Sequence, residues 1–154
     1  MEKMYYLAYG SNLNIRQMKY RCPTAKAVGT AVIKNYELLF KGSKTGSYLT
    51  IEKCEGDYVP VGVWEVTEDD IRRLDIYEGY PSFYYKTELP VVLKTFKGEK
   101  RKVQALVYIM HEERPLGMPS MGYVRTCNEG YNAFGFKVQH LIKALDKSRK
   151  GGTV

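Results

Sequence analysis

The sequence MYYLAYGSNL, residues 4–13, begins with residues that favour strands and ends in a Gly-Ser-Asn-Leu turn. Aromatic and apolar residues in such a run predict a buried strand over residues 4–9. Residues 14–21 predict a short helix, because Pro23 follows closely and cannot continue it. The chain therefore begins with a strand that enters a helix through a turn of small residues.

The turn itself has two interpretations. Ser11 and Asn12 are residue types that commonly cap a helix N-terminus, and this role alone would explain them. Alternatively, the backbone N–H groups of Gly10, Ser11 and Asn12 face a carboxylate or phosphate group, since a helix start presents unpaired donors to anions. Gly10 would permit close approach of a ligand and any positive φ. The turn is compatible with both.

Strands are expected to dominate the middle of the chain. Residues 25–40 predict one long strand, or two with a break at Asn35. Residues 42–47, GSKTGS, predict a hairpin turn, since they lack the Gly-Lys-Ser/Thr order of a phosphate-binding loop. Pro90 has no backbone N–H, so its strand is expected to bulge or to lie at a sheet edge. The remaining strands are predicted over residues 47–55, 59–67, 83–95 and 101–111.

Two longer helices are expected. Residues 67–81 show a capping-box pattern at Thr67 and Asp70, and Gly79 with Pro81 ends the helix. Residues 118–136 predict a loop that packs on the sheet. Near the C-terminus, apolar residues recur at helical spacing, at Val138, Leu141, Ile142 and Leu145.

The pattern of elements predicts one domain of the α+β class, spanning residues 1–154. No internal repeat or low-complexity linker divides the 154 residues. Because the strands are mostly consecutive, we expect a small, mixed, barrel-like β-sheet with short flanking helices.

Glu78 is the acidic residue whose surroundings are least favourable to its charge. It is expected at a helix C-terminus, where the helix dipole disfavours a carboxylate, and Tyr77 and Tyr80 flank it. Such a carboxyl group is a candidate for a raised pKa and for general acid–base catalysis. The alternative is an exposed Glu in the last turn of a helix.

No metal, cofactor or disulfide is indicated. The three cysteines, Cys22, Cys54 and Cys127, are far apart, and only His111 and His140 could assist a metal. The N-terminus has an acidic residue and no long apolar core, and no stretch is apolar enough to span a membrane. We therefore expect reduced thiols and a cytoplasmic setting.

The formal net charge of +7 raises the question of a nucleic-acid partner. The basic residues concentrate around a turn at Gly98 and at the C-terminus. Both clusters fit the solvated ends of a hairpin and a helix, so no nucleic-acid partner is expected.

Three motifs in this order resemble the γ-glutamyl cyclotransferase family, also described as AIG2-like. They are YLAYGSNL from Tyr6, LDIYEGYP around Glu78, and PSMGY ending at Tyr123, followed by a Gly-Phe near residue 136. Together they span residues 6–136. The resemblance implies the family's small mixed barrel with flanking helices.

The resemblance also implies roles for individual residues. Glu78 is implied as the general base, and the turn from Tyr9 as the binding site of the γ-glutamyl moiety. The tyrosine on the following strand maps onto Tyr85, with Tyr84 as the alternative if the register differs by one. Tyr131 stands where a smaller residue often follows the glycine, which bears on substrate preference. The implied substrate-binding residues are Tyr6, Tyr9, Gly10, Ser11, Asn12, Leu13, Tyr85 and Tyr123.

The implied activity is release of 5-oxoproline from a small-molecule γ-glutamyl amine or amino acid, by attack of the substrate's own α-amine. The absence of metal-ligand spacing and of a nucleophile–base pair in the sequence is compatible with this reaction, which needs no cofactor. The alternative is a non-catalytic module of the same fold that binds an acidic small molecule.

Overall fold

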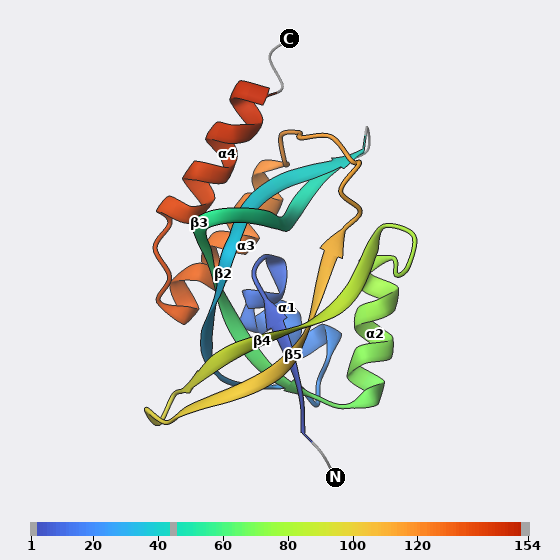
Figure 1. Ribbon diagram of the computed structural model, residues 1–154. Coiled ribbons are helices and arrows are strands. Elements are labelled where there is room, and N and C mark those ends of the chain that lie inside the picture. Colours follow the sequence, from blue (N-terminus) through green and yellow to red (C-terminus); the bar gives the residue numbers. More distant parts are fainter. Residues whose placement is uncertain (1–2, 44–45, 152–154) are drawn as a thin grey trace.

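A closed five-stranded barrel forms the centre of the protein (Figure 1). The computed structural model describes residues 3–43 and 46–151, so Lys44 and Thr45 of the expected GSKTGS turn lie outside the described residues. The strands are ordered β1-β3-β2-β4-β5, and all neighbours are antiparallel except β1 and β5. Their bounds are β1 Met4–Ala8, β2 Lys26–Ser43, β3 Gly46–Val66, β4 Tyr84–Thr95 and β5 Lys100–Met110.

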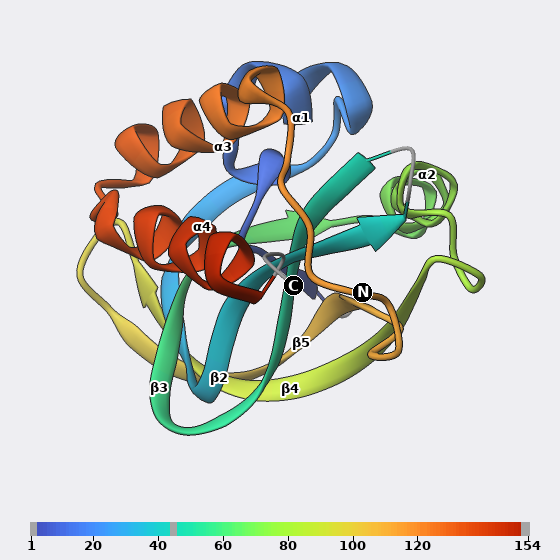
Figure 2. The ribbon, with the colours of Figure 1, turned by 90° about the horizontal axis from the view of Figure 1, so that it is seen from above.

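Helices flank the barrel, as expected. In Figures 1 and 2, α3 and α4 cover one side and α2 lies on another. The mixed α+β class and the barrel are thus confirmed. The helices are η1 Ser11–Leu13, α1 Ile15–Arg21, α2 Glu68–Glu78, α3 Met121–Phe134 and α4 Gln139–Gly151. No helix among the described residues is both long and apolar enough to cross a membrane.

Three predicted interruptions of the strands have different outcomes. Asn35 adopts a φ of 63° at a register shift between β2 and β3, so it marks a bulge within one continuous strand. The two strands expected over residues 47–55 and 59–67 merge into the single strand β3. Pro90 causes no bulge: β4 pairs with β5 throughout and with β2 only near its end, so Pro90 lies at an open edge.

The prediction of a loop over residues 118–136 was wrong, because α3 occupies most of it. Ser120 caps this helix by accepting a hydrogen bond from the Tyr123 backbone N–H, and Gly135 ends it with a φ of 77°. Gly130 lowers intrinsic helix propensity, but a Cβ there would lie 2.5 Å from the backbone carbon of Leu13. Close packing against η1 therefore outweighs propensity.

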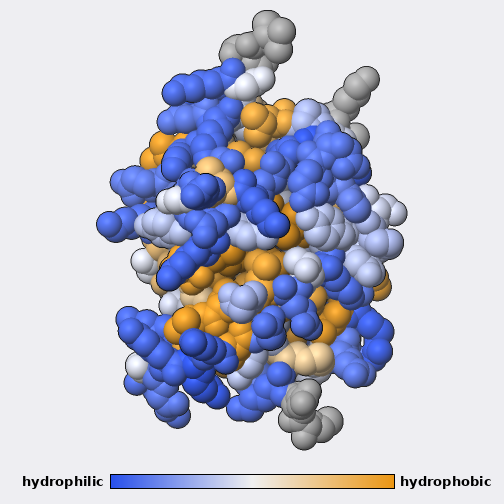
Figure 3. All heavy atoms as spheres, in the orientation of Figure 1, coloured by the Kyte–Doolittle hydropathy of each residue, from blue (hydrophilic) through white to orange (hydrophobic). Residues whose placement is uncertain are grey.

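The core fills the barrel and extends under the helices. Phe40, Ile51 and Leu93 are fully buried within it, and Leu141 attaches α4. Of the other apolar residues expected on that helix, Val138 precedes it and is 39% exposed. Ile142 is 47% exposed, since the buried face runs through Leu141, Ala144 and Ser148. The surface in Figure 3 is mostly hydrophilic, with apolar side chains gathered over part of the molecule.

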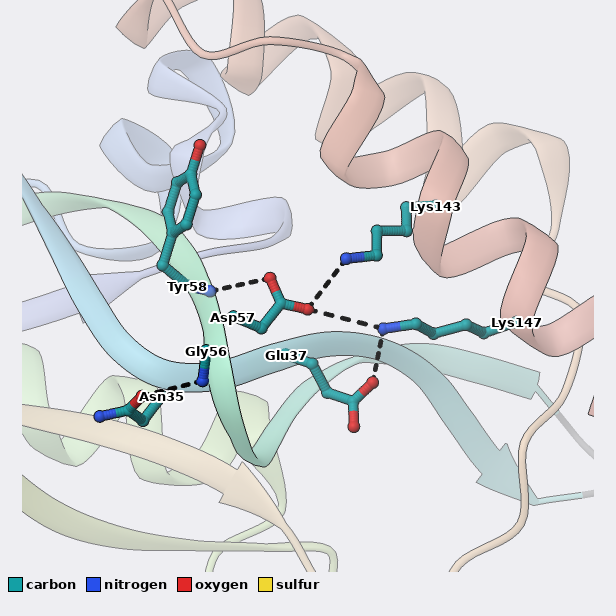
Figure 4. A network of polar contacts seen from close by, with 7 residues as sticks. All are labelled: Asn35, Glu37, Gly56, Asp57, Tyr58, Lys143 and Lys147. Carbon is teal, nitrogen blue, oxygen red and sulfur yellow. Dashed lines mark hydrogen bonds and ion pairs between the residues drawn. The ribbon is translucent and has the colours of Figure 1, made fainter.

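Ion pairs fix α4 to the barrel (Figure 4). The Lys147 ammonium group contacts the carboxylates of Glu37 and Asp57, and Lys143 lies 3.1 Å from Asp57. Glu37, Asp57 and the Cys54 thiol place their polar atoms within 4.8 Å of one another, a separation compatible with a metal site. The two lysines already neutralise the carboxylates, so this cluster is an ion-pair network.

Candidate active site

A cavity of about 440 Å³ brings the three sequence motifs together. The turn after β1 forms one wall and the end of α2 a second. The strands β1, β3, β4 and β5, the residues before β4 and the start of α3 form the remainder. Its size lies within the range of small-molecule sites. The predicted site residues that line it are Tyr6, Tyr9, Gly10, Ser11, Asn12, Glu78 and Tyr123.

The turn is not a simple helix cap. Asn14 caps α1 by accepting a hydrogen bond from the Gln17 N–H, and η1 has no side-chain cap. The N–H groups of Gly10, Ser11 and Asn12 donate to no residue in the described part of the chain. The donors therefore remain available to an anion in the cavity.

Gly10 leaves little space for a side chain. Its φ is −129°, so no left-handed conformation is involved, but a Cβ there would lie 3.2 Å from the Tyr123 hydroxyl and 3.4 Å from Leu49. Leu13 needs correction as a substrate-binding residue, because it is fully buried in the core. Its N–H donates to the Gly10 carbonyl, which closes the turn.

Glu78 is the last residue of α2 and its carboxyl group lies in the cavity wall. Burial raises the pKa of this carboxyl from 4.5 to about 7, and the Arg21 guanidinium partly opposes the shift. The Asn12 side-chain amide is 3.5 Å from Glu78 Oε1. A carboxyl group that is half ionised near neutral pH is suited to both accepting and returning a proton.

Arg21 is a site residue that sequence reasoning missed. Its guanidinium donates to Asn12 Oδ1 and lies 3.4 Å from the centre of the Tyr77 ring. The Asn12 amide group therefore points its NH₂ toward Glu78 and toward the Tyr6 hydroxyl, 2.8 Å away. No local pattern in α1 distinguishes Arg21 from other basic residues in a last helical turn.

The tyrosine of β4 that faces the cavity is Tyr84, which corrects the mapping onto Tyr85. The Tyr84 hydroxyl donates to the Leu49 carbonyl at 2.8 Å, whereas Tyr85 bonds the Glu112 carboxylate 2.5 Å away and does not line the cavity. Successive side chains of a strand point to opposite faces, so a register difference of one residue exchanges the two.

Seven tyrosines line the cavity, and the phenol groups of four of them are buried and neutral. Burial raises the pKa of the phenols of Tyr6, Tyr9, Tyr84 and Tyr123 well above its usual range. Tyr9 donates to the Tyr108 carbonyl at 2.7 Å. The Tyr6 hydroxyl instead accepts a hydrogen bond from Asn12, which leaves its proton available to a ligand.

Tyr131 lies beneath the site and is fully buried. Its hydroxyl donates to the Tyr9 carbonyl at 3.2 Å, so it supports the residue just before the Gly-Ser-Asn turn. Tyr131 does not line the cavity, which gives it a structural role and no direct contact with a ligand there.

Comparison with protein families adds the decisive observation. A family model described as Gamma-glutamyl cyclotransferase, AIG2-like, matches residues 6–125. The chain belongs to this family. The matched residues include the turn after β1, Glu78 and Tyr123, which are the parts of the chain that meet at the cavity.

Curated relatives of this cyclotransferase-family chain extend over nearly its whole length. The Gamma-glutamylcyclotransferase of Homo sapiens is 28% identical over 162 residues, covering 99% of this chain and 84% of the relative. That of Bos taurus is 28% identical over 149 residues, covering 92% and 77%. A solved structure of a Gamma-glutamyl cyclotransferase superposes with a TM-score of 0.79 at 26% identity, covering 93% of this chain and 86% of its own.

Replacement of Glu78 by Gln is expected to stabilise this cyclotransferase-family fold at high pH. Because the folded-state pKa is raised from 4.5 to about 7, the folded protein retains a proton that the unfolded chain has lost. The contribution of Glu78 to the free energy of unfolding is therefore fully present below pH 4.5 and is lost as pH rises through 7, by up to about 3 kcal/mol. Gln carries no such penalty.

Urea unfolding of both proteins at pH 5 and pH 8 measures this effect. The Glu78→Gln variant should gain stability relative to the wild type on going from pH 5 to pH 8. If the free energies of unfolding of the two proteins differ by the same amount at both pH values, the pKa of Glu78 is not shifted in the folded state.

Proposed function

We propose that this protein is a γ-glutamyl cyclotransferase that releases 5-oxoproline. The substrate's α-amine attacks its own γ-amide carbonyl; a C–N bond closes the lactam ring and the original amide C–N bond breaks. The leaving amine departs with a proton, so atoms and charges balance without water. The observation that carries this proposal is a carboxyl group with a pKa of about 7 facing a turn of unpartnered N–H groups across one cavity.

The turn is proposed to hold the α-carboxylate of the substrate. The N–H groups of Ser11 and Asn12 are unpartnered in the described chain and lie at the cavity wall. The Trp64 indole donates to the Asn12 carbonyl at 3.1 Å and so fixes the turn before a substrate arrives. A preorganised set of donors binds an anion without the cost of rearrangement.

Glu78 is proposed to take a proton from the α-ammonium group and to return it to the leaving nitrogen. The α-ammonium group of an amino acid is a far weaker acid than an ordinary Glu carboxyl group, so an ordinary Glu would be a poor base for it. Raising the pKa of Glu78 from 4.5 to about 7 makes the transfer more favourable by about 3 kcal/mol. The same carboxyl group, once protonated, is a sufficient acid for the second step.

The remaining contribution is the shape of the cavity. Folding the substrate so that its amine reaches its own carbonyl removes rotational freedom before the reaction, which lowers the barrier by several kcal/mol. The Tyr6 hydroxyl is the neutral donor best suited to the developing oxyanion, since its proton is available and Asn12 fixes its oxygen.

A substrate panel tests the function. The wild-type protein is incubated with γ-glutamyl amino acids, γ-glutamyl-lysine isopeptides and γ-glutamyl alkylamines, and 5-oxoproline is measured. Turnover of at least one class is expected. Saturable binding of these compounds without 5-oxoproline release would instead assign a non-catalytic module that binds acidic small molecules.

Replacement of Arg21 by Met is expected to shift the pH dependence of turnover upward. The guanidinium lowers the pKa of Glu78, so its loss leaves the base protonated to a higher pH. The kcat/KM value at pH 6.5 should fall several-fold, with a smaller loss at pH 9. Arg21→Lys keeps the charge and is the matched control. An unchanged pH profile in Arg21→Met would contradict this role.

A further inference from the structure

The barrel is weakly joined between β2 and β4. Only two residue pairs connect these strands, Gly29 with Thr95 and Thr30 with Lys94, whereas β4 pairs with β5 along its whole length. Beyond these pairs the strands diverge, and a groove of about 950 Å³ lies between residues 31–34 of β2 and 89–92 of β4. The facing edges therefore carry backbone groups that no neighbouring strand pairs.

Several outward-facing side chains of the groove are apolar. Val32 is 43% exposed, Tyr58 48% and Val92 50%. Phe136 and His140, from the α3–α4 connection and α4, close one end. On the face shown in Figure 3, apolar surface lies among hydrophilic side chains. Exposed apolar residues gathered in a concave site mark a binding surface more often than scattered ones do.

Lysine side chains surround these exposed apolar residues. None of the lysines of the groove forms an ion pair within residues 3–43 or 46–151, and no carboxylate lines the groove, whereas Lys86, Lys143 and Lys147 elsewhere are all paired. The unpaired lysines are Lys34, Lys94, Lys100, Lys102 and Lys137.

Two of these lysines are placed against each other. Lys94 and Lys100 are direct cross-strand partners on β4 and β5, and Lys102 stands opposite Val92. Like charges directly opposite in a sheet are destabilising. An anionic partner would remove this repulsion, so the groove is complementary to negative charge.

We propose that the groove docks an extended, acidic segment of another protein, which adds as a strand between β2 and β4. Acidic side chains on the outward face of the segment would reach Lys34, Lys94 and Lys102, which share that face with Val32 and Val92. Apolar side chains on the opposite face of the segment would contact Ala31 and Val91. A second copy of this chain would bring the same lysines together and add its own charge of +7. A bilayer surface cannot enter the groove to reach the strand edges. An added strand would pair with the backbone groups of both strand edges, and its side chains would contact the apolar residues and the lysines of the groove.

Fluorescence anisotropy with a fluorescein-labelled heptapeptide of alternating Glu and Val tests the proposal. Saturable binding to the wild-type protein is expected. Lys94→Glu/Lys102→Glu should weaken it by at least about tenfold, since two attractive contacts become repulsive. Both side chains are exposed, so the fold should be retained. Lys19→Glu/Lys53→Glu makes the same change in net charge at exposed sites outside the groove and should bind as the wild type does.

A second peptide separates strand addition from charge attraction. N-methylation of alternate backbone amides removes the donors of one edge while the side chains stay the same. We expect binding to weaken by at least about tenfold. Equal binding of the methylated peptide would overturn strand addition. Two results would overturn the proposal as a whole. One is an equal loss of peptide affinity in both double variants. The other is tighter binding of duplex DNA or of phosphatidylserine vesicles than of the peptide.

Discussion

Replacement of Glu78 by Gln should lower the rate of 5-oxoproline release by about 10²- to 10⁴-fold, the range attributed to a general acid–base catalyst. Gln has nearly the same shape and can still face the Asn12 amide, but it cannot accept a proton at neutral pH. The proposed function assigns to Glu78 both proton transfers of the reaction. Among the described residues, no other carboxyl group lines the cavity, so no second carboxylate there can replace Glu78 as the base.

The measurement compares kcat and KM for the wild type, Glu78→Gln and Glu88→Gln. Glu88 is an exposed carboxylate on β4 outside the cavity and serves as the matched control. Far-UV circular dichroism should be the same for all three proteins. Full activity of Glu78→Gln would reject the proposed base while leaving the cavity as a binding site.

Replacement of Tyr131 by Ala should lower the free energy of unfolding by about 3–5 kcal/mol, the usual range for removal of a buried aromatic side chain. The Tyr131 ring packs edge-on against Phe136, with 5.7 Å between ring centres, and its hydroxyl supports the Tyr9 carbonyl. Tyr131→Phe loses only the hydrogen bond and should cost about 1 kcal/mol.

Urea unfolding at a single pH measures both changes. Tyr131→Phe should also reduce turnover, because the strand end that leads into the Gly-Ser-Asn turn loses a support. A loss of less than 1 kcal/mol in Tyr131→Ala would contradict the close packing of α3 under the site.

The sequence predicts only those site residues whose environment is set by their neighbours in the chain. Glu78 at a helix end beside tyrosines and Gly10 after a strand are local features, and both residues line the cavity. That Glu78 and Gly10 line the same cavity could not be derived from their spacing, because they are 68 positions apart in the chain. The resemblance to the family supplied that link.

The sequence by itself determined the elements whose ends are set by neighbouring residues. The capping box of Thr67 and Asp70, the left-handed Gly79 and the Asn35 bulge each depend on contacts or dihedral angles within a few residues. Because these interactions form between residues that are close in the chain, the amino-acid sequence is enough to predict them.

Only the tertiary structure decided the features that join distant segments. It brings Arg21 onto Asn12, turns Tyr84 rather than Tyr85 into the cavity, and buries Glu78 enough to raise its pKa. It also packs Gly130 of α3 closely against η1. Burial and strand register depend on what the other elements place nearby, and that information is spread over the whole chain.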